Sequence, residues 1–342
     1  MPSIVASRRT VLKAGAALTI LAATGAALPK RPRAQSAGTP CHSRTRALMG
    51  TFVTISVAHE SPDFAEQAVA LAFERMEELI PVYNRFDPSS PLSVLNDQGA
   101  VRGAPEELAA LLRRAREYHS LTQGAFNPAV KPVLDLLAHT AARDPQVRVD
   151  RQDLLDRLDL VRLDALRLSP HSVVLERQGM GLTLDGLAKG RIVDAASQAL
   201  RTMGARNHLV DAGGDIRTSG ERAEGRAWAV AVQNPEGGEY PDVIRMRDGA
   251  VATSGAYEIW FGGNRLVHHI VDPRTGRSPH ALASATVRAS SVAEADALST
   301  ALFVARPRQG LALIDSLPGV ESLLLTPQGG RLASRGWDRL HS

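Results

Sequence analysis

The stretch from residue 291 to residue 302, Ser-Val-Ala-Glu-Ala-Asp-Ala-Leu-Ser-Thr-Ala-Leu, predicts a helix with few solvent-facing positions. Ser291 and Glu294 have the spacing of a capping box, which places the helix start at Ser291. Asp296 and Thr300 are four residues apart and share one face. The spacing alone favours an exposed polar pair. The Ala and Leu residues around the pair indicate a buried helix, which favours a purposeful pair, such as one that holds a hard cation through oxygen ligands.

The rest of the sequence predicts further helices and a series of short strands. A second helix is predicted over residues 190–203, with Gly204 as its stop, and two more begin near Pro62 and Pro105. Many short β-type runs with few helices favour an α+β fold over a regular βαβ repeat. The predicted strands cover residues 46–57, 208–210, 228–232, 243–246, 267–271, 285–289 and 321–325. The segment 138–172 is rich in Arg and Asp with weak periodicity, so we expect a variable surface excursion there.

Residues 1–36 have the layout of an export signal rather than of folded structure. Arg8-Arg9 precedes a weakly apolar run, which is the pattern of a twin-arginine leader. The prediction is a periplasmic protein with a folded domain over residues 37–342; the alternative is an uncleaved leader that serves as an anchor. The leader holds six of the 40 Lys and Arg residues and none of the 36 Asp and Glu residues, so the formal net charge falls from +4 to −2 without it. The high isoelectric point therefore does not indicate a nucleic-acid partner. Cys41 is the only cysteine, which excludes a disulfide framework.

Two glycine-containing clusters carry candidate chemistry. Asp185-Gly186-Leu187-Ala188-Lys189-Gly190 leads into the second helix, where a glycine and a lysine near a helix start favour an anion such as a diphosphate. The alternative is a tight turn with a solvated Lys189. Asp211-Ala212-Gly213-Gly214-Asp215 follows a strand, and a plain turn is the favoured interpretation there.

Adjacent histidines form another candidate feature. His268 and His269 lie in a predicted strand and would point to opposite faces, one toward the core and one available as a proton acceptor. Asp272 begins the turn Asp-Pro-Arg-Thr-Gly, so it either orients a histidine or caps that turn.

Taken together and in order, these motifs resemble the ApbE family of FAD:protein FMN transferases. The resemblance runs from Leu48-Met49-Gly50-Thr51 to the helix of Asp296. It includes the segments 86–90, 95–96, 124–128, 186–190, 213–215, 253–255 and 269–276.

The resemblance implies an α+β, two-lobed fold related to the T-fold group, with FAD in a cleft between the lobes. It implies Mg²⁺ on the side chains of Asp296 and Thr300 and the carbonyl of Gly186. His269 and Lys189 would be the catalytic residues. The residues implied to contact FAD are Met49, Phe86, Ala125, Phe126, Asn127, Thr183, Lys189, His269 and Ile270.

The implied reaction transfers FMN from FAD to a Thr or Ser hydroxyl of a partner flavoprotein and releases AMP. Magnesium and Lys189 would neutralise charge on the phosphates, and His269 would accept the hydroxyl proton. Two alternatives remain: a periplasmic protein that only binds or delivers FAD, and a magnesium-dependent FAD pyrophosphatase. A carrier alone would not need the pair of Asp296 and Thr300.

Two positions depart from the family pattern. Thr183 and Asn127 stand where the family commonly has Asp, which changes the expected FAD contacts there. The run Leu182-Thr183-Leu184 is similar to the branch associated with nitrous-oxide respiration. That similarity implies an acceptor on the periplasmic side of a membrane electron-transfer protein.

Overall fold

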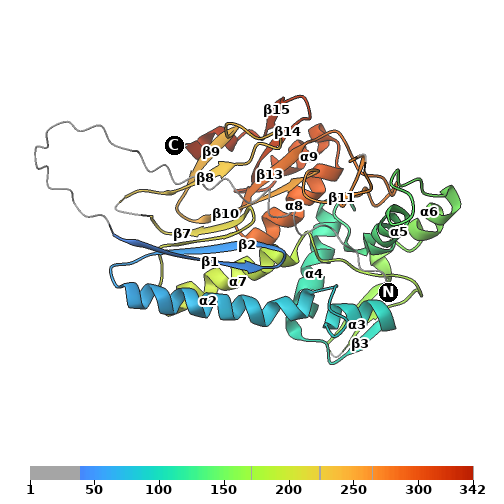
Figure 1. Cartoon of the computed structure of the whole chain (residues 1–342), viewed down its shortest axis with the longest axis horizontal. Helices are drawn as coiled ribbons and strands as arrows, with labels where there is room; N and C mark the ends of the chain where they lie inside the picture. The colour runs from blue at the N-terminus through green and yellow to red at the C-terminus, as the bar shows by residue number, and fades with distance from the viewer. Residues whose placement is uncertain (1–38, 171, 223–224, 264, 342) are drawn as a thin grey trace, which may run out of the picture.

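The computed structural model describes residues 39–170, 172–222, 225–263 and 265–341. The export signal predicted over residues 1–36 lies outside this part of the chain. The described residues form an α+β fold, as predicted, with a large sheet lobe and a smaller, mostly helical lobe beside it (Figure 1). Among the described residues, no helix combines the length and apolar character that crossing a membrane requires.

The larger lobe is organised around an eight-stranded sheet in the order β1-β2-β6-β7-β10-β13-β14-β15, in which neighbouring strands are antiparallel. The strands are β1 (Cys41–Leu48), β2 (Thr51–Ala58), β6 (His208–Ala212), β7 (Asp215–Ser219), β10 (Gly249–Gly255), β13 (Ser284–Ala289), β14 (Glu321–Leu325) and β15 (Arg331–Ala333). Predictions at 208–210, 285–289 and 321–325 are confirmed, whereas β7 and β10 were not predicted.

The prediction of one strand over residues 46–57 is wrong, because the chain reverses at Met49 and Gly50. β1 and β2 form a hairpin in which Leu48 pairs with Thr51. Met49 and Gly50 have φ values of 52° and 75°. A two-residue turn with positive φ at both central positions matches the twist of the flanking strands. The sequence gives little sign of this reversal, because the residues on both sides of the turn have β-type sequence.

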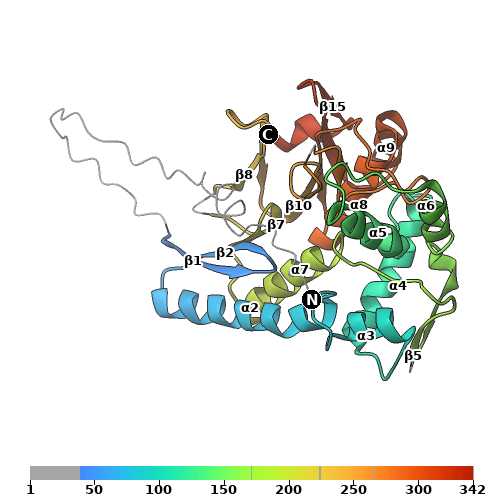
Figure 2. The ribbon, with the colours of Figure 1, turned by 45° about the vertical axis from the view of Figure 1, so that its right-hand side comes forward.

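Three helices cover one face of the sheet, α2 (Pro62–Tyr83), α7 (Ala188–Met203) and α8 (Val292–Val304) (Figures 1 and 2). α8 packs on β10 and β13 and also against α7, which explains why both of its sides are apolar. The predicted starts of α2 and α8 and the predicted end of α7 are confirmed, whereas α7 begins at Ala188, two residues before the predicted start at Gly190. The Ser61 and Ser291 side chains cap α2 and α8, and Gly204 ends α7 with φ 98°. The capping box is only half formed, because Glu294 accepts hydrogen bonds from Ser290 instead of Ser291.

The other face of the sheet is covered by the hairpin of β8 (Trp228–Val232) and β9 (Asp242–Met246). Both strands are predicted from sequence, but their pairing and their position are not. Alternate residues of a strand face opposite sides, so Val251 packs toward this hairpin while Ala250 and Ala252 pack toward the helices. Trp337, in the final turn η3 (Trp337–His341), fills the centre of the hairpin side.

The smaller lobe contains the helices between α2 and α7 and a three-stranded sheet in the order β3-β5-β4 (Figure 2). The segment 138–172 includes α6 and β4, and its Val147, Leu163 and Leu166 are buried. The elements of this lobe are α3 (Pro91–Gln98), β3 (Ala100–Arg102), α4 (Glu106–Leu121), η1 (Pro128–Val130), α5 (Lys131–Ala141), α6 (Arg151–Leu158), η2 (Leu163–Ala165), β4 (Leu166–Ser169) and β5 (Ser172–Leu175).

Three short elements complete the described chain, α9 (Pro307–Ile314) and the strand pair β11 (Trp260–Phe261) and β12 (Val267–His268). The strand predicted over residues 267–271 is therefore too long. Only its first two residues pair with β11, because the chain turns at Asp272, whose carbonyl oxygen accepts from the amide of Gly276 at 2.8 Å.

Candidate active site

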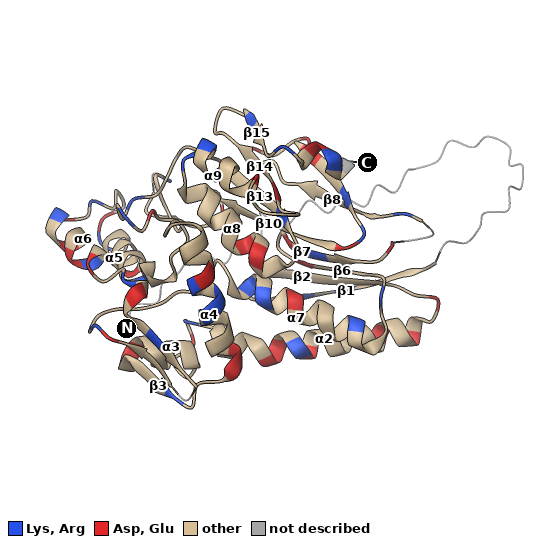
Figure 3. Cartoon of the chain, turned by 180° about the vertical axis from the view of Figure 1, so that it is seen from behind, with Lys and Arg blue, Asp and Glu red and all other residues tan. Residues whose placement is uncertain are grey.

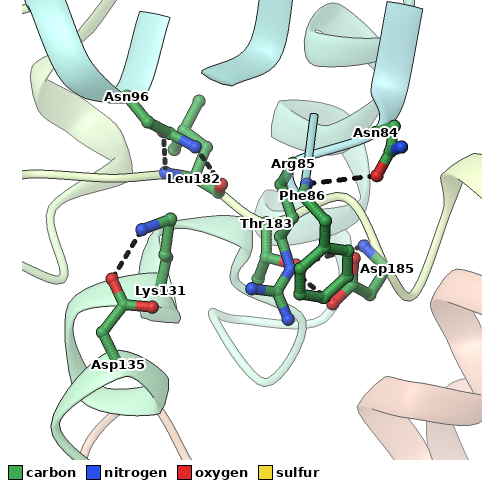
Figure 4. A network of polar contacts seen from close by, with 9 residues as sticks. All are labelled: Asn84, Arg85, Phe86, Asn96, Lys131, Asp135, Leu182, Thr183 and Asp185. Atoms are coloured by element: carbon green, nitrogen blue, oxygen red, sulfur yellow. Dashed lines mark hydrogen bonds and ion pairs between the residues drawn. The ribbon is translucent and has the colours of Figure 1, made fainter. Parts of the chain in front are cut away.

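The segment from Gly181 to Leu187 connects the smaller lobe to α7 and has no regular secondary structure (Figure 4). Asn96 holds it on the side of α3: its side-chain amide donates to the Leu182 carbonyl at 2.9 Å and its Oδ1 accepts from the Leu182 amide at 2.7 Å. The amide of Thr183 donates to the carbonyl of Pro128 at 2.8 Å. These bonds replace a sheet ladder and place Asp185 and Gly186 immediately before the helix.

Gly186 lies directly against α8. A Cβ atom at this position would lie 2.8 Å from Thr300 Oγ1 and 3.6 Å from the ring of Phe126. The glycine therefore allows the backbone of this turn to approach the hydroxyl of Thr300. Thr300 Oγ1 is also 3.2 Å from Ser254 Oγ on β10. The structure thus brings together Gly186 and Thr300, two of the three residues implied to bind a metal.

Asp296, the third of these residues, is buried one helical turn before Thr300. Its Oδ2 has no hydrogen-bond partner among the described residues. Burial raises the pKa of Asp296 well above its usual value, the Asp215 carboxylate raises it further, and Lys189 opposes both effects. A buried carboxylate oxygen without a partner is costly, and a cation would compensate it. The oxygen atoms of Asp296, Thr300 and Gly186 are of the type that Mg²⁺ prefers, so these residues fit such an ion.

Lys189 is paired with the buried carboxylate of Asp215 and is not a solvated surface side chain. Its Nζ lies 3.4 Å from Oδ2 of Asp215, whose side chain is only 3% exposed. Burial alone would lower the pKa of Lys189, but Asp215, Asp296 and Glu258 outweigh burial and raise it above its ordinary value. Lys189 is therefore an ammonium group at neutral pH, with three carboxylates acting on it.

The two adjacent histidines have different environments. His268 is buried, with Nε2 2.9 Å from the Pro279 carbonyl oxygen, and burial lowers its pKa to about 4. His269 is partly exposed, and its Nδ1 lies 3.3 Å from the carbonyl oxygen of Ile259. Burial lowers the pKa of His269, while Glu258 and Asp185 act in the opposite direction. Its imidazole is therefore neutral at pH 7 and can accept a proton. Asp272 binds Arg274 and caps its own turn.

The residues implied to contact FAD occupy both lobes. Phe86 is 75% exposed, and the guanidinium of Arg85 lies 4.2 Å from its ring centroid. Arg85 in turn forms an ion pair of 2.8 Å with Asp185, so the aromatic ring is carried next to the Gly186 turn (Figure 4). The others are Met49 in the β1–β2 turn, the buried Ala125, Phe126 and Ile270, Asn127 as the cap of η1, and Thr183, whose Oγ1 accepts from the Asp185 amide.

Comparison with known proteins places this architecture in a family. The ApbE family model matches residues 49–324, more than half of the chain. The chain belongs to the ApbE family. It is 33% identical to the FAD:protein FMN transferase of Treponema pallidum, over 86% of this chain and 87% of the relative. It is 29% identical to the enzyme of that name from Haemophilus influenzae, over 77% and 82% of the two chains.

Solved ApbE structures have the same fold. The ApbE protein of Thermotoga maritima aligns with a TM-score of 0.80 and 28% identity, covering 89% of this chain and all of that one. The flavin transferase ApbE of Vibrio cholerae aligns with a TM-score of 0.76 and 25% identity, covering 88% of this chain and 100% of that one. The two-lobed α+β fold implied by the sequence is thus confirmed for this ApbE-family chain.

Sequence reasoning missed three polar residues of this ApbE-family site. Asp215 was noted only within a turn, Glu258 was not identified, and Ser254 was given no role. Asp215 and Ser254 lie within strands of the large lobe, and Glu258 lies three residues after β10. Each acts on Lys189, Asp296 or Thr300. The signal that could have found Asp215 is the pair Gly213-Gly214 beside an acidic residue at a strand start. Nothing in the sequence near Glu258 distinguishes it from a surface acid.

Proposed function

We propose that this protein transfers the FMN moiety of FAD to a Ser or Thr hydroxyl of an acceptor protein, releases AMP and requires Mg²⁺. Its membership of the ApbE family and the names of its relatives support the transfer of FMN to protein. The observation that carries the finer proposal is the unpartnered, buried Oδ2 of Asp296 beside Thr300 and the Gly186 turn. A protein that only stores flavin has no use for such a carboxylate.

The chain's own residues have separable roles in this reaction. Asp296, Thr300 and the Gly186 carbonyl would hold Mg²⁺, which supplies charge neutralisation at the phosphates when bound. The ammonium group of Lys189, held by Asp215, places a second positive charge near the same turn. The exposed ring of Phe86 offers an aromatic surface to the flavin, and the buried ring of Phe126 packs beside Gly186. FAD would therefore lie between the lobes, with its diphosphate toward Lys189.

His269 is the proposed general base. The neutral imidazole takes the proton of the acceptor hydroxyl while that oxygen attacks the phosphorus of the FMN phosphate. The bond between this phosphorus and the bridging oxygen breaks, and AMP leaves with that oxygen. Lys189 remains protonated throughout, since the neighbouring carboxylates raise its pKa.

The cellular compartment of the reaction is also part of the proposal, and it is inferred from the sequence of the leader. The protein would act in the periplasm after export by the twin-arginine route, as an already folded domain. The acceptor would be a flavoprotein domain on the periplasmic side of a membrane electron-transfer protein.

The decisive experiment is to incubate the full chain with FAD, MgCl₂ and a Thr-containing acceptor domain, and to measure acceptor mass. We expect an acid-stable FMN adduct and an equivalent amount of AMP. Asp296→Asn should slow adduct formation by about 10²–10³-fold, whereas the exposed Asp153→Asn should match the unchanged protein.

Two other results would contradict transfer. Free FMN and AMP without adduct would identify a pyrophosphatase, and intact FAD would identify a carrier. Equal rates with MgCl₂ and with EDTA would contradict the magnesium requirement.

A further inference from the structure

A cavity outside the candidate active site has neither Lys189 nor Asp296 in its lining. Its volume is about 340 Å³, and it is bounded by α4, α7, β7 and the start of α8. The rear view in Figure 3 shows α4, α7 and α8 next to one another, with basic segments on α4 and α7. α7 therefore contributes Lys189 to the candidate active site at its start and several later residues to this cavity.

Four arginines line the cavity, Arg114 from α4, Arg191 and Arg201 from α7, and Arg217 from β7. Arg114 is paired with Glu117, and Arg217 donates to the carbonyl of Ser290. The guanidinium groups of Arg191 and Arg201 have no hydrogen bond or ion pair within the described part of the chain. Two cationic groups of the cavity are thus available to a ligand.

Among the described residues, the cavity wall contains one carboxylate, that of Asp194, and both of its oxygens already accept hydrogen bonds from the backbone. Its Oδ1 accepts from the Val292 amide at 2.9 Å and its Oδ2 accepts from the Ala293 amide at 3.0 Å. Both oxygens therefore cap the start of α8. Asp194 keeps its negative charge, but four arginines line the cavity with it, so the formal charge of the lining residues is positive.

The arginines are also close enough to act on one another. Burial lowers the pKa of Arg217, Arg201 and Arg288 lower it further, and Asp194 opposes them. Like charges gathered around a partly buried space repel one another, and a bound dianion would relieve that repulsion.

We propose that this cavity binds a small phosphate-bearing molecule, with Arg191 and Arg201 on its phosphate. Arginine presents planar, bidentate donors that match phosphate oxygens. The volume exceeds that of one phosphate ion, and Leu111 and Tyr118 give part of the wall apolar surface. The occupant is therefore either free phosphate or a phosphomonoester whose organic part fills the remaining volume.

The test is isothermal titration calorimetry on the full chain at constant ionic strength, in EDTA, with inorganic phosphate and with AMP in separate titrations. We expect Arg201→Gln and Arg191→Gln each to weaken binding by about tenfold. Arg308→Gln, an exposed arginine on α9, is the matched control and should bind as the unchanged protein does. Arg201→Lys should retain only part of the affinity, because lysine keeps the charge but not the bidentate geometry. Thermal unfolding of each variant shows whether it is folded.

The outcomes distinguish free phosphate from a phosphomonoester as the occupant of the cavity. Tighter binding of AMP than of phosphate indicates a phosphomonoester, and equal binding indicates that the phosphate group alone is recognised. Absence of binding by both probes up to about 10 mM would overturn the proposal. The same holds if the Arg191 and Arg201 variants bind as tightly as Arg308→Gln. Neither readout uses flavin transfer, so the result is independent of the proposed function.

Discussion

Lys189 and His269 respond differently to burial, and the difference comes from their neighbours. Burial disfavours the charged form of both side chains. Lys189 has Asp215 at 3.4 Å and two further carboxylates acting on it, so its charge is retained. The carboxylates Glu258 and Asp185 only partly oppose the effect of burial on His269, and Lys189 reinforces that effect. Lys189 therefore stays cationic while His269 stays neutral, as their proposed roles in phosphate binding and proton transfer require.

This assignment predicts a pH profile. The pKa of His269 is lowered from 6.5, so the imidazole is neutral at pH 7 and the rate of FMN transfer should be constant there. The rate should fall only as the pH decreases below 6.5, where the base becomes protonated. His269→Gln should reduce the rate by about 10²–10⁴-fold and remove this acidic limb.

The rate is obtained from the mass of the acceptor against time. It is measured between pH 5 and pH 8, a range of about three pH units that includes the ordinary histidine pKa. His139→Gln, at an exposed position of α5, is the control and should keep the profile. An acidic limb that persists unchanged in His269→Gln would show that another group titrates.

At the scale of elements, the contact between the starts of α7 and α8 positions the site. Gly190, in the first turn of α7, packs on α8 so closely that a Cβ would lie 2.7 Å from backbone atoms of Val292 and Ala293. This contact places Lys189 and Asp296, which sit on different helices, close enough to interact. The glycine therefore serves helix packing here and needs no positive φ.

Substitution of Gly190 by alanine tests this packing, because the sign of the change in the free energy of unfolding distinguishes helix propensity from helix packing. In an isolated helix, Gly→Ala would stabilise by about 1 kcal/mol. Gly190→Ala should instead destabilise the protein by about 1–3 kcal/mol, because backbone atoms of α8 must move. Urea unfolding measures the difference. Gly263→Ala is the control, since a Cβ there meets nothing within 4 Å and should leave stability nearly unchanged. A stabilised Gly190→Ala variant would contradict the packing argument.

For the whole molecule, the proposed site contains residues of both lobes. Ligands that bind there should therefore stabilise both lobes of the native state together. Phe86 and Phe126 come from the smaller lobe, whereas Asp296 and Lys189 come from the helices on the large sheet. A ligand that contacts both groups and binds only the folded chain raises its stability by mass action.

We predict that FAD with MgCl₂ raises the free energy of unfolding by more than the sum of their separate effects. At 100 times the Kd, a ligand contributes about 2.7 kcal/mol. Thermal unfolding with FAD, MgCl₂, both and neither measures the coupling. Asp296→Asn should abolish the coupling while keeping most of the effect of FAD alone. Purely additive shifts in the unchanged protein would contradict a shared site for the ion and the diphosphate.

Local signals were enough to predict much of the fold. Ser61, Gly204 and Ser291 mark helix ends through bonds and backbone angles within a few residues of each position, so α2, α7 and α8 could be located from sequence. The strands at 228–232 and 321–325 followed from their apolar runs in the same way. The reversal at Met49 and Gly50 was missed because a turn between two β-type arms carries a weak signal.

The sequence by itself determined the α+β class, the family and the positions of Gly186, Lys189, His269, Asp296 and Thr300 as candidates. Only the tertiary structure decided how they act. Lys189 is charged because Asp215 and Glu258, from other segments of the chain, lie close enough to act on it. Oδ2 of Asp296 has no hydrogen-bond partner among the described residues because α8 is buried on both sides. These properties depend on distances and desolvation between residues far apart in the chain, which no local pattern of residues specifies.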